Sequence, residues 1–300
     1  MLHKPGLIQR TFTKFSGDIL SDTARITFIG AGNMASCIIG GLINNGYPAA
    51  CLSASARSNT NLTPLAEELG IATSTDNSAF VQNSDVVILA VKPQNLQSVC
   101  EEIRTEFTSR SPLFISIAAG VACDSICSWL QQDVALVRCM PNTPAKVLAG
   151  ASGLYANDKV DSTQKQLAQS ILAAVGSVSW VEEEGMIDSV TAIAGSGPAY
   201  FFLFIEAMID AGVAQGFDRA TAETLAIQTA FGASKLAKES LQNGIDVVEL
   251  RRRVTSPKGT TEQAILSFEH NNLRSTVQQA MDACRDRAQE LAKLMAETKA

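Results

Sequence analysis

Two segments of the chain carry residue types that suit the binding of small anions. Gly30–Ala35 reads GAGNMA, and Ser256–Thr261 reads SPKGTT. Small residues let a ligand approach the backbone closely, and the free N–H groups at the start of a helix stabilise an anion. We therefore expect the first segment to bind the phosphates of a dinucleotide and the second to bind a small carboxylate. The same protein would then bind both a cofactor and an anionic substrate.

The first segment lies in the order strand, glycine turn, helix that a dinucleotide site needs. Ile26–Ile29 is an apolar run typical of a strand, and the helical spacing of Ile38, Ile39 and Leu42 follows the glycines. A GxGxxA motif by itself often marks only a tight turn, but this order favours dinucleotide binding. The predicted cofactor contacts in this segment are Gly30, Gly32, Asn33 and Met34.

The end of the second predicted strand indicates which dinucleotide binds. Sites that prefer NAD usually carry an acidic residue there, which holds the ribose 2′-hydroxyl. Cys51–Asn59 contains no acid. Ser55, Arg57 and Ser58 are instead suited to hydrogen-bond and neutralise a 2′-phosphate, although an ordinary solvated loop would look similar. We expect NADPH as the cofactor, with NADH possible.

The carboxyl ends of other predicted strands should form the rest of this site, because ligands of open α/β sheets lie beyond those ends. Gly120 and its neighbouring alanines leave room for a flat ring, and Asn142 offers an amide to a carboxamide. Lys92 has three possible roles: catalytic cation, phosphate contact or solvated side chain. The predicted cofactor contacts here are Ala90, Val91, Lys92, Pro93, Ala118, Ala119, Gly120 and Asn142.

The scarcity of histidine restricts the chemistry. His3 and His270 are the two histidines, and the helical region from Pro198 to Ser240 has no Lys–Asn pair four residues apart. A dehydrogenase of ketones or hydroxy acids would need such a group as its proton relay. The remaining hydroxyls and amides suit an imine, because a protonated C=N accepts hydride with little acid assistance.

Ser256–Thr261 allows two readings. Gly259 and the amides that follow it could cradle a carboxylate at the start of a helix. Alternatively, Thr260 or Thr261 could simply cap that helix, with Glu262 in its first turn. The two readings are compatible, and position alone does not separate them.

Alternation of short β-rich runs with helical stretches predicts an α/β fold, with a parallel sheet covered by helices on both faces. The predicted strands are 25–30, 50–55, 85–91, 113–117, 135–140, 151–156 and 177–181, and the helices between them include 62–69, 95–109 and 162–175. After about Glu182 only helical patterns follow, at 198–214, 220–240, 246–253, 260–270 and 273–297.

The predicted domains are therefore a flexible extension at 1–24, a Rossmann-type dinucleotide-binding domain at 25–182, and an all-helical substrate and dimerisation domain at 183–300. The extension carries Lys4, Arg10 and Lys14 but no acid before Asp18, so it could be a weak organellar presequence. A plain extension of a cytoplasmic protein is the alternative that we favour.

Composition argues against several other classes of protein. The net charge of −6 makes nucleic acid and anionic membranes poor partners. The seven cysteines contain no CxxC pair, so neither a disulfide framework nor a metal site is expected. The most apolar run, Ala199–Ile205, is too short to span a bilayer.

The motifs IGAGNMA, LAVKPQ, SIAAGV, RCMPNTPA, GSGPAYFFLFIEAM and VTSPKGTT occur here in the order of a known family. From about Ile26 to Met295 the chain resembles pyrroline-5-carboxylate reductase. The resemblance implies reduction of 1-pyrroline-5-carboxylate to proline, the last step of proline synthesis. The alternatives are a reductase of the same architecture for another imine or 2-keto acid, and a non-catalytic dinucleotide sensor.

The resemblance also implies roles for individual residues. Ser256, Gly259 and Thr260 would hold the substrate carboxylate, with Thr261 as the catalytic residue near the ring nitrogen. Ser196 and Gly197 would approach the substrate or the nicotinamide. Lys258 departs from the family, which usually has a second glycine there. The family forms homodimers, often assembled into larger homo-oligomers, and the small residues at Ala222, Ala226 and Ala230 would let helices pack closely in one.

Overall fold

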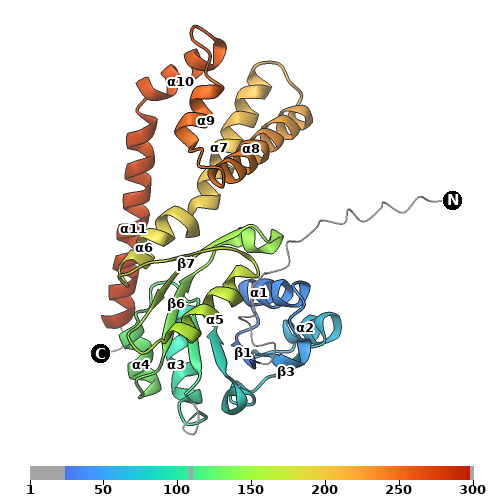
Figure 1. Ribbon diagram of the computed structural model, residues 1–300, viewed down its shortest axis with the longest axis vertical. Helices are drawn as coiled ribbons and strands as arrows, with labels where there is room; N and C mark the ends of the chain where they lie inside the picture. Colours follow the sequence, from blue (N-terminus) through green and yellow to red (C-terminus); the bar gives the residue numbers. More distant parts are fainter. Residues whose placement is uncertain (1–23, 108–110, 298–300) are drawn as a thin grey trace, which may run out of the picture.

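The structure is a computed structural model that describes residues 24–107 and 111–297. The predicted extension at 1–24 therefore lies almost wholly outside the described residues. Figure 1 shows two parts, with a sheet and its covering helices below and a group of helices above. The α/β fold with a helical second part is confirmed.

One eight-stranded sheet organises the lower part, in the order β3-β2-β1-β4-β5-β6-β7-β8. The first six strands are parallel, β7 runs antiparallel to β6, and β8 is parallel to β7. The strands are β1 (Ile26–Ile29), β2 (Leu52–Ser55), β3 (Ala72–Ser74), β4 (Val86–Leu89), β5 (Leu113–Ser116), β6 (Leu136–Met140), β7 (Gly150–Ala156) and β8 (Gly176–Trp180).

Two features of this sheet differ from the prediction. The sequence analysis missed β3, which has only three residues, all at least partly exposed. The antiparallel direction of β7 was not predicted either. Between β6 and β7 lies only a short 3-10 segment, η3 (Thr143–Val147). A parallel pairing needs a crossover of a dozen or more residues, so the short connection forces the reversal.

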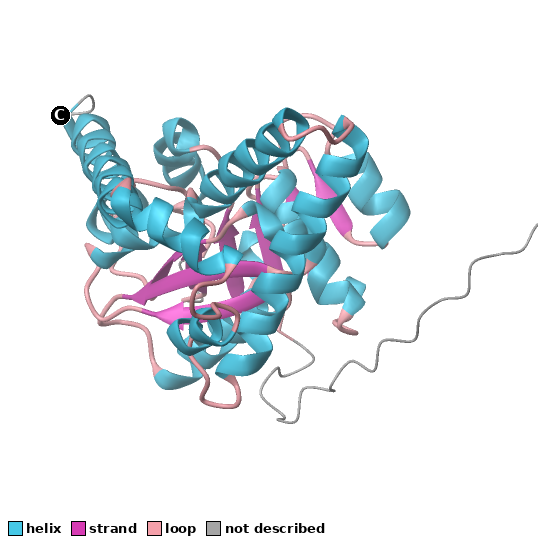
Figure 2. Ribbon diagram, turned by 90° about the horizontal axis from the view of Figure 1, so that it is seen from above, coloured by secondary structure: helices cyan, strands magenta, loops and turns pink. Residues whose placement is uncertain are grey.

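Helices cover both faces of the sheet, as Figure 2 shows from above. Strand residues alternate between two buried clusters: Ile26 and Phe28 lie in one, and Ile29, Leu89 and Phe114 lie in the other. The covering helices are α1 (Asn33–Asn44), α2 (Leu62–Leu69), α3 (Pro93–Ile103), α4 (Cys123–Leu130) and α5 (Ser162–Ala173), with short 3-10 segments η1 (Ala49–Cys51) and η2 (Val81–Asn83).

The second part contains α6 (Met186–Val190), η4 (Thr191–Gly195), α7 (Gly197–Ala214), α8 (Arg219–Leu241), α9 (Val247–Arg253), α10 (Thr260–His270) and α11 (Leu273–Glu297). The sequence analysis missed α6 and η4 and began the first helix at Pro198. η4 is a π-helical turn, a wider turn than that of the α-helix. In Figure 1, α11 runs from the top of this part down beside the sheet.

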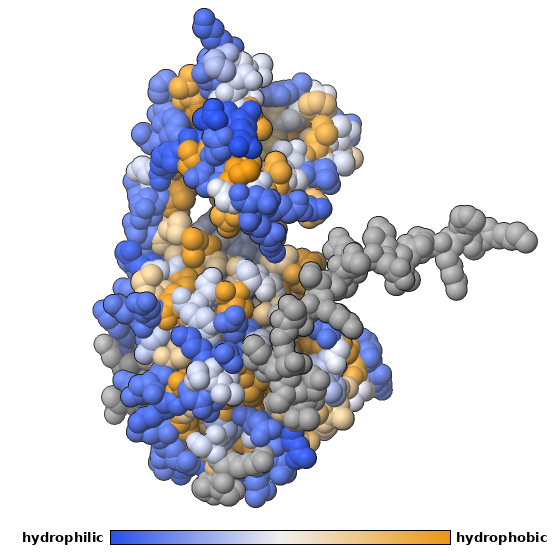
Figure 3. Space-filling model, viewed as in Figure 1, coloured by the Kyte–Doolittle hydropathy of each residue, from blue (hydrophilic) through white to orange (hydrophobic). Residues whose placement is uncertain are grey.

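Because α6, η4 and α7 follow one another without a loop, Met186–Ala214 forms a helical stretch of 29 residues, long and apolar enough to cross a membrane by length and composition. The sequence analysis considered only Ala199–Ile205, a part of this stretch. The stretch is poorly covered within one chain. Phe201, Phe202 and Leu203 are each more than 60% exposed, and Figure 3 shows apolar residues over the upper part and a hollow beneath it.

A partly buried ion pair joins the two parts. The Arg138 guanidinium on β6 donates to the Glu184 carboxylate at 2.7 Å, two residues before α6 begins. The same carboxylate oxygen accepts the N–H of Cys123 at the start of α4. Asp188 lies near this pair, and burial, with a contribution from Glu184, raises the pKa of its carboxyl. The chain thus enters its helical part from a position fixed against β6 and α4.

Candidate functional site

A cavity of about 550 Å³ opens at the carboxyl ends of β1, β2 and β4. This is the edge of the sheet at which ligands of doubly wound folds lie. Its lining residues are Gly30, Gly32, Ala56, Arg57, Ser58, Asn61, Thr75, Asn77, Ala90, Val91, Lys92, Asn95, Ser98, Val99 and Glu102. Six predicted contacts besides Gly30 are therefore brought together here: Gly32, Arg57, Ser58, Ala90, Val91 and Lys92.

The glycine turn after β1 requires glycine at Gly30. Its φ is +103°, and a Cβ at this position would lie 2.6 Å from the carbonyl oxygen of Ala90. Gly32 faces open space, with no atom within 4 Å of an added Cβ, so a ligand can approach its backbone. Gly32 is also the N-cap of α1, which has no side-chain cap and no acid in its first turn. The amides of Asn33 and Met34 begin this uncapped helix, and the turn fits the pyrophosphate of a dinucleotide.

The structure separates the three residues that were predicted to contact the 2′-phosphate. Arg57 and Ser58 are exposed and line the cavity. Ser55 is fully buried behind its wall, and its hydroxyl donates to Asn77 Oδ1 at 2.9 Å. Ser55 therefore does not line the cavity itself, and its hydroxyl instead orients Asn77, which does.

Asn77 and Glu102 also line the cavity, and the sequence analysis missed both. The Asn77 amide donates to the Glu102 carboxylate at 2.9 Å. Asn77 follows the carboxyl end of β3, so the strand that the sequence analysis overlooked would have indicated it. Glu102 lies within α3, where no pattern distinguishes it from an ordinary surface acid.

The ends of β5 and β6 lie outside this cavity. Pro93 begins α3 and does not line the cavity. Ala118 is buried, Ala119 is exposed, and Gly120 has a φ of +72° and lies against Ala292 of α11. Ala118, Ala119 and Gly120 lie at the same edge of the sheet as the cavity, so they stay candidates for contacts with the nicotinamide ring.

Asn142 makes hydrogen bonds within the chain. Its Nδ2 donates to the carbonyl of Ala194 at 3.0 Å, and its Oδ1 accepts the N–H of Ala151 at 2.9 Å. Both ends of the amide are used, and the side chain is 8% exposed. Asn142 thus fastens η4 to β7, and its contact with a carboxamide stays a prediction.

Ser196 lies at the junction of η4 and α7, next to the sheet edge. Its neighbour Gly195 packs against Met140 at the end of β6, where an added Cβ would lie 2.5 Å from Met140 Cε. The Ser196 hydroxyl lies 3.2 Å from Cys284 Sγ on α11. Gly197 is buried as the first residue of α7. The structure thus places this predicted pair beside the strand ends, as an active-site role requires.

The second predicted anion site joins α9 to α10. Gly259 is the N-cap of α10, and no side chain caps the helix. The alternative in which Thr260 or Thr261 serves as a plain cap is therefore wrong, and both residues are exposed within the first turn. The Glu262 carboxylate instead accepts the N–H of Lys258 at 2.7 Å. An uncapped helix start remains available to an anion.

The loop keeps a glycine-like conformation although it carries Lys258. The φ of Lys258 is +59°, in the left-handed region that side chains other than glycine rarely adopt. Gly259 is also required, since a Cβ there would lie 2.9 Å from the carbonyl oxygen of Ser256. The departure from the family pattern thus adds a cation and leaves the left-handed turn in place.

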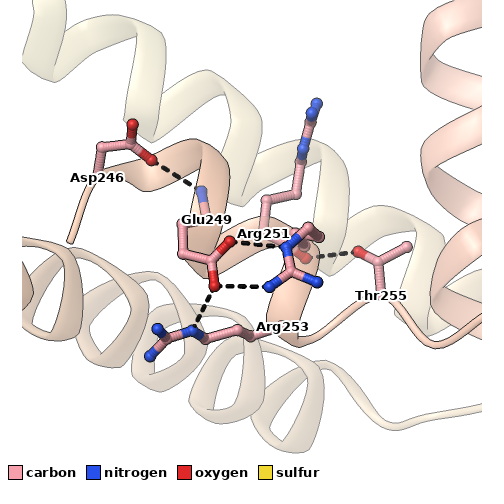
Figure 4. A network of polar contacts seen from close by, with 6 residues as sticks. Asp246, Glu249, Arg251, Arg253 and Thr255 are labelled. Atoms are coloured by element: carbon pink, nitrogen blue, oxygen red, sulfur yellow. Dashed lines mark hydrogen bonds and ion pairs between the residues drawn. The ribbon is translucent and has the colours of Figure 1, made fainter.

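A polar network braces the entry to this loop (Figure 4). Asp246 caps α9, and the Glu249 carboxylate accepts hydrogen bonds from Arg252 and Arg253 at 2.7 to 2.8 Å. These hydrogen bonds lower the pKa of Glu249 to about 2. The Thr255 hydroxyl donates to the carbonyl of Arg251 at 2.6 Å.

One chain does not bring the two predicted anion sites together. α9 and α10 lie in the upper part of Figure 1, whereas the cavity opens at the sheet in the lower part. No residue of Ser256–Thr261 belongs to the cavity lining. A site that contains both the cavity and this loop would therefore need the loop of another copy of the chain.

Comparisons with known proteins agree with this division. Residues 25–120 match the family model "NADP oxidoreductase coenzyme F420-dependent", and residues 184–291 match "Pyrroline-5-carboxylate reductase dimerisation". A pyrroline-5-carboxylate reductase of Pseudomonas aeruginosa is 48% identical over 90% of this chain and 97% of its own length, and one of Methanosarcina acetivorans is 41% identical over 91% and 99%.

Solved structures show the same similarity. A pyrroline-5-carboxylate reductase from Coxiella burnetii has a TM-score of 0.86 and 47% identity, over 90% of this chain and 98% of that one. The Plasmodium falciparum pyrroline carboxylate reductase with NADP bound has a TM-score of 0.76 and 30% identity, over 90% and 99%. With such identity along nearly its whole described length, this chain belongs to the pyrroline-5-carboxylate reductase family.

Proposed function

We propose that the protein reduces 1-pyrroline-5-carboxylate to L-proline with a hydride from NADPH. The observation that carries this proposal is the uncapped start of α10, which offers a carboxylate site in a chain that also has a dinucleotide cavity. The names of the relatives and the NADP bound to one of them support the same substrate and cofactor.

The protein's own part in the reaction is binding and orientation. The amides of Thr260 and Thr261 and the hydroxyl of Ser256 hold the carboxylate, and the Thr261 hydroxyl hydrogen-bonds near the ring nitrogen. Arg57 and Ser58 hold the 2′-phosphate of the cofactor, and the start of α1 holds its pyrophosphate. The bound nicotinamide supplies the hydride. Little acid catalysis is needed from side chains, since the protonated imine is already electrophilic.

The loop that binds the substrate serves the cavity of a second copy. This arrangement is supported by the separation of loop and cavity in one chain and by the exposed apolar side chains of α7 and α8, including Phe202 and Phe231. The long apolar stretch Met186–Ala214 is then a subunit interface of a cytoplasmic homodimer or larger homo-oligomer. The domains run from 25 to 182 and from 183 to 300, with Glu184 at the junction.

The substrate is tested by following NADPH oxidation with purified protein. Rapid turnover with pyrroline-5-carboxylate, slower turnover with NADH, and none with a 2-keto acid are expected. Faster turnover of a keto acid or of another cyclic imine than of pyrroline-5-carboxylate would identify a related reductase. Cofactor binding without turnover of any of these compounds would identify a dinucleotide sensor and refute the proposal.

The sharing of the site between copies is tested by mixing two variants that each have strongly reduced activity. Thr261→Ala removes the loop hydroxyl, and Gly30→Val blocks the cofactor turn, where an added Cβ already meets Ala90. If each site takes its loop from the partner, co-refolded mixtures regain about a quarter of wild-type activity, because each heterodimer keeps one intact site. A site contained within one chain predicts no recovery.

A further inference from the structure

The contact between Ser196 and Cys284 joins two segments that are far apart in the sequence. Ser196 ends the π-helical turn η4 at the sheet edge, and Cys284 lies in the middle of α11, with its Sγ 3.2 Å from the Ser196 hydroxyl oxygen. Either group can donate this hydrogen bond. It is the hydrogen bond that the structure gives to the Ser196 hydroxyl.

The backbone around Ser196 is fixed by other interactions. Its N–H donates to the carbonyl of Thr191 at 2.8 Å, the Asn142 amide binds the carbonyl of Ala194, and Met140 packs under Gly195. None of these interactions orients the side-chain hydroxyl. The direction in which the hydroxyl points is therefore set by the side chains around it, and among these the Cys284 thiol lies at hydrogen-bonding distance.

Tyr200, one turn further along α7, completes this polar group. Its hydroxyl oxygen is buried and has no hydrogen-bond partner within the described part of the chain. Burial raises the pKa of Tyr200, the neighbouring Cys284 thiol adds to the rise, and the Ser196 hydroxyl opposes it. A buried polar group without a partner destabilises the fold, so its presence calls for an explanation.

The same helix also contacts a second loop of the candidate site. Ala292 follows Cys284 on the i, i+4, i+8 row of α11, and its backbone lies 3.9 Å from the position of a Cβ on Gly120. α11 therefore touches both the Ser196 junction and the loop after β5. A helix that begins in the upper part of the molecule thus reaches the edge of the sheet where the nicotinamide is expected (Figure 1).

We infer that Cys284 is a positioning residue: through its contact with Ser196 it directs that hydroxyl toward the bound substrate and nicotinamide. The inference rests on the proposed function, in which Ser196 lies at the active site. Cys284 itself touches neither ligand. Its thiol is a hydrogen-bonding partner, so a hydroxyl can replace it and a methyl cannot.

A double-mutant cycle tests this inference. Ser196→Ala, Cys284→Ala, Cys284→Ser and the double variant Ser196→Ala/Cys284→Ala are compared for kcat/KM with pyrroline-5-carboxylate, for KM of NADPH and for Tm. Cys284→Ala is expected to lower kcat/KM by roughly three- to tenfold with the KM of NADPH unchanged, and Cys284→Ser to restore most of it. The double variant should be no worse than Ser196→Ala alone, because both changes remove one interaction. Cys127→Ala, which removes a partly buried thiol from α4, is the matched control and should match the wild type.

Each other outcome has a definite meaning. Additive effects of the two single changes would overturn the inference, since Cys284 would then act by packing and not through Ser196. Wild-type kinetics in Ser196→Ala or in Cys284→Ala would also overturn it. Wild-type protein that reduces no pyrroline-5-carboxylate in the same assay would instead refute the proposed function, and the inference with it.

Discussion

The two parts of the molecule bury their apolar side chains to very different extents. Around the sheet, two clusters bring strands and helices together, and residues such as Phe28, Ile88 and Phe114 are completely buried. In the helical part, the buried cluster consists of Ile209, Ala222 and Ala226. Large apolar residues of this part, such as Phe201, Leu203 and Phe231, lie instead on the surface of the single chain.

This difference separates two sources of stability. The sheet-containing part completes its hydrophobic core within one chain, so its dinucleotide cavity is formed by that chain alone. The helical part leaves large apolar side chains exposed, and burial of each is worth roughly 1.5–3 kcal/mol. In the proposed function, a second copy supplies that burial and, with it, the loop that binds the substrate.

The difference between the two parts is tested most strongly by placing a charge on the exposed apolar face of α7. Phe202→Asp should convert the oligomer to monomers and lower kcat/KM by about a hundredfold or more, because loop and cavity would no longer be held together. Affinity for NADPH should stay within a few-fold, because the cavity belongs to the other part. Light scattering, turnover and NADPH titration measure these effects, with Phe202→Leu as the apolar control. Full activity in a monomer would contradict the shared site.

Thr261 tests the substrate loop without disturbing the oligomer. Thr261→Ala should lower kcat/KM for pyrroline-5-carboxylate by about ten- to a hundredfold, and Thr261→Ser should recover much of the loss. Tm should hardly change in either variant, because Gly259 and not Thr261 is the N-cap. An early-melting Thr261→Ala protein with normal turnover would mean that the residue stabilises a helix and plays no part in the reaction.

Arg57 tests the cofactor end of the sheet-containing part. Arg57→Asp should raise the KM of NADPH by roughly tenfold or more and narrow or reverse the preference over NADH, since a charge-assisted hydrogen bond is worth about 1.5–3 kcal/mol. Steady-state kinetics with both cofactors measure the preference. Arg57→Gln is the control that removes the charge without adding a repulsion. An unchanged preference would show that the 2′-phosphate is bound elsewhere.

Lys258 tests whether the loop carries strain. Lys258→Gly should stabilise the protein by up to about 1 kcal/mol. The left-handed conformation costs residues other than glycine roughly 1–2 kcal/mol, and the greater flexibility of glycine in the unfolded chain offsets part of the gain. Urea denaturation at fixed protein concentration measures the change. Lys258→Ala keeps the strain and should show no gain. Equal stability of the alanine and glycine variants would argue that the turn is not strained.

Glu249 gives the smallest expected effect and one that depends on pH. Its pKa in the folded protein is about 2, below the ordinary 4.5, so its network stabilises the fold above about pH 4.5 and the contribution fades as pH falls toward 2. Glu249→Gln should therefore lower the urea midpoint slightly at pH 7 and less at pH 4. Because the carboxylate is exposed, high salt should reduce the difference. A difference that grows on acidification would contradict this sign.

In the sheet-containing part, the sequence predicted those elements whose structure depends on neighbouring residues of the chain. The turn at Gly30 was found because a strand, a glycine requirement and a helix follow one another directly. The inward hydrogen bonds of Ser55 and Asn142 could not be predicted, because sequence does not show which side chain at a strand end turns inward. β3 was missed since three partly exposed residues give no usable periodicity.

In the helical part, the elements could be predicted but their exposed surfaces could not. Helical spacing of apolar residues looks the same whether a face packs within the chain or against another copy. The same ambiguity hides the placement of the substrate loop, because its position relative to the cavity is a property of the assembly. The family resemblance supplied roles there that residue patterns alone left open.

The π-helical turn η4 changes the direction in which one continuous helical stretch presents its apolar residues. Each residue turns an α-helix by about 100°, so the extra residue of a π-turn rotates everything after it by about that amount. Before and within the turn, Ile187 and Ala192 are buried against the sheet; beyond it, Phe201 and Phe202 face outward. The π-turn thus lets one continuous helix face the sheet at its start and face outward along α7, without a linker between the two parts. A single-residue deletion within 191–195 would rotate α7 and turn its exposed apolar face in another direction.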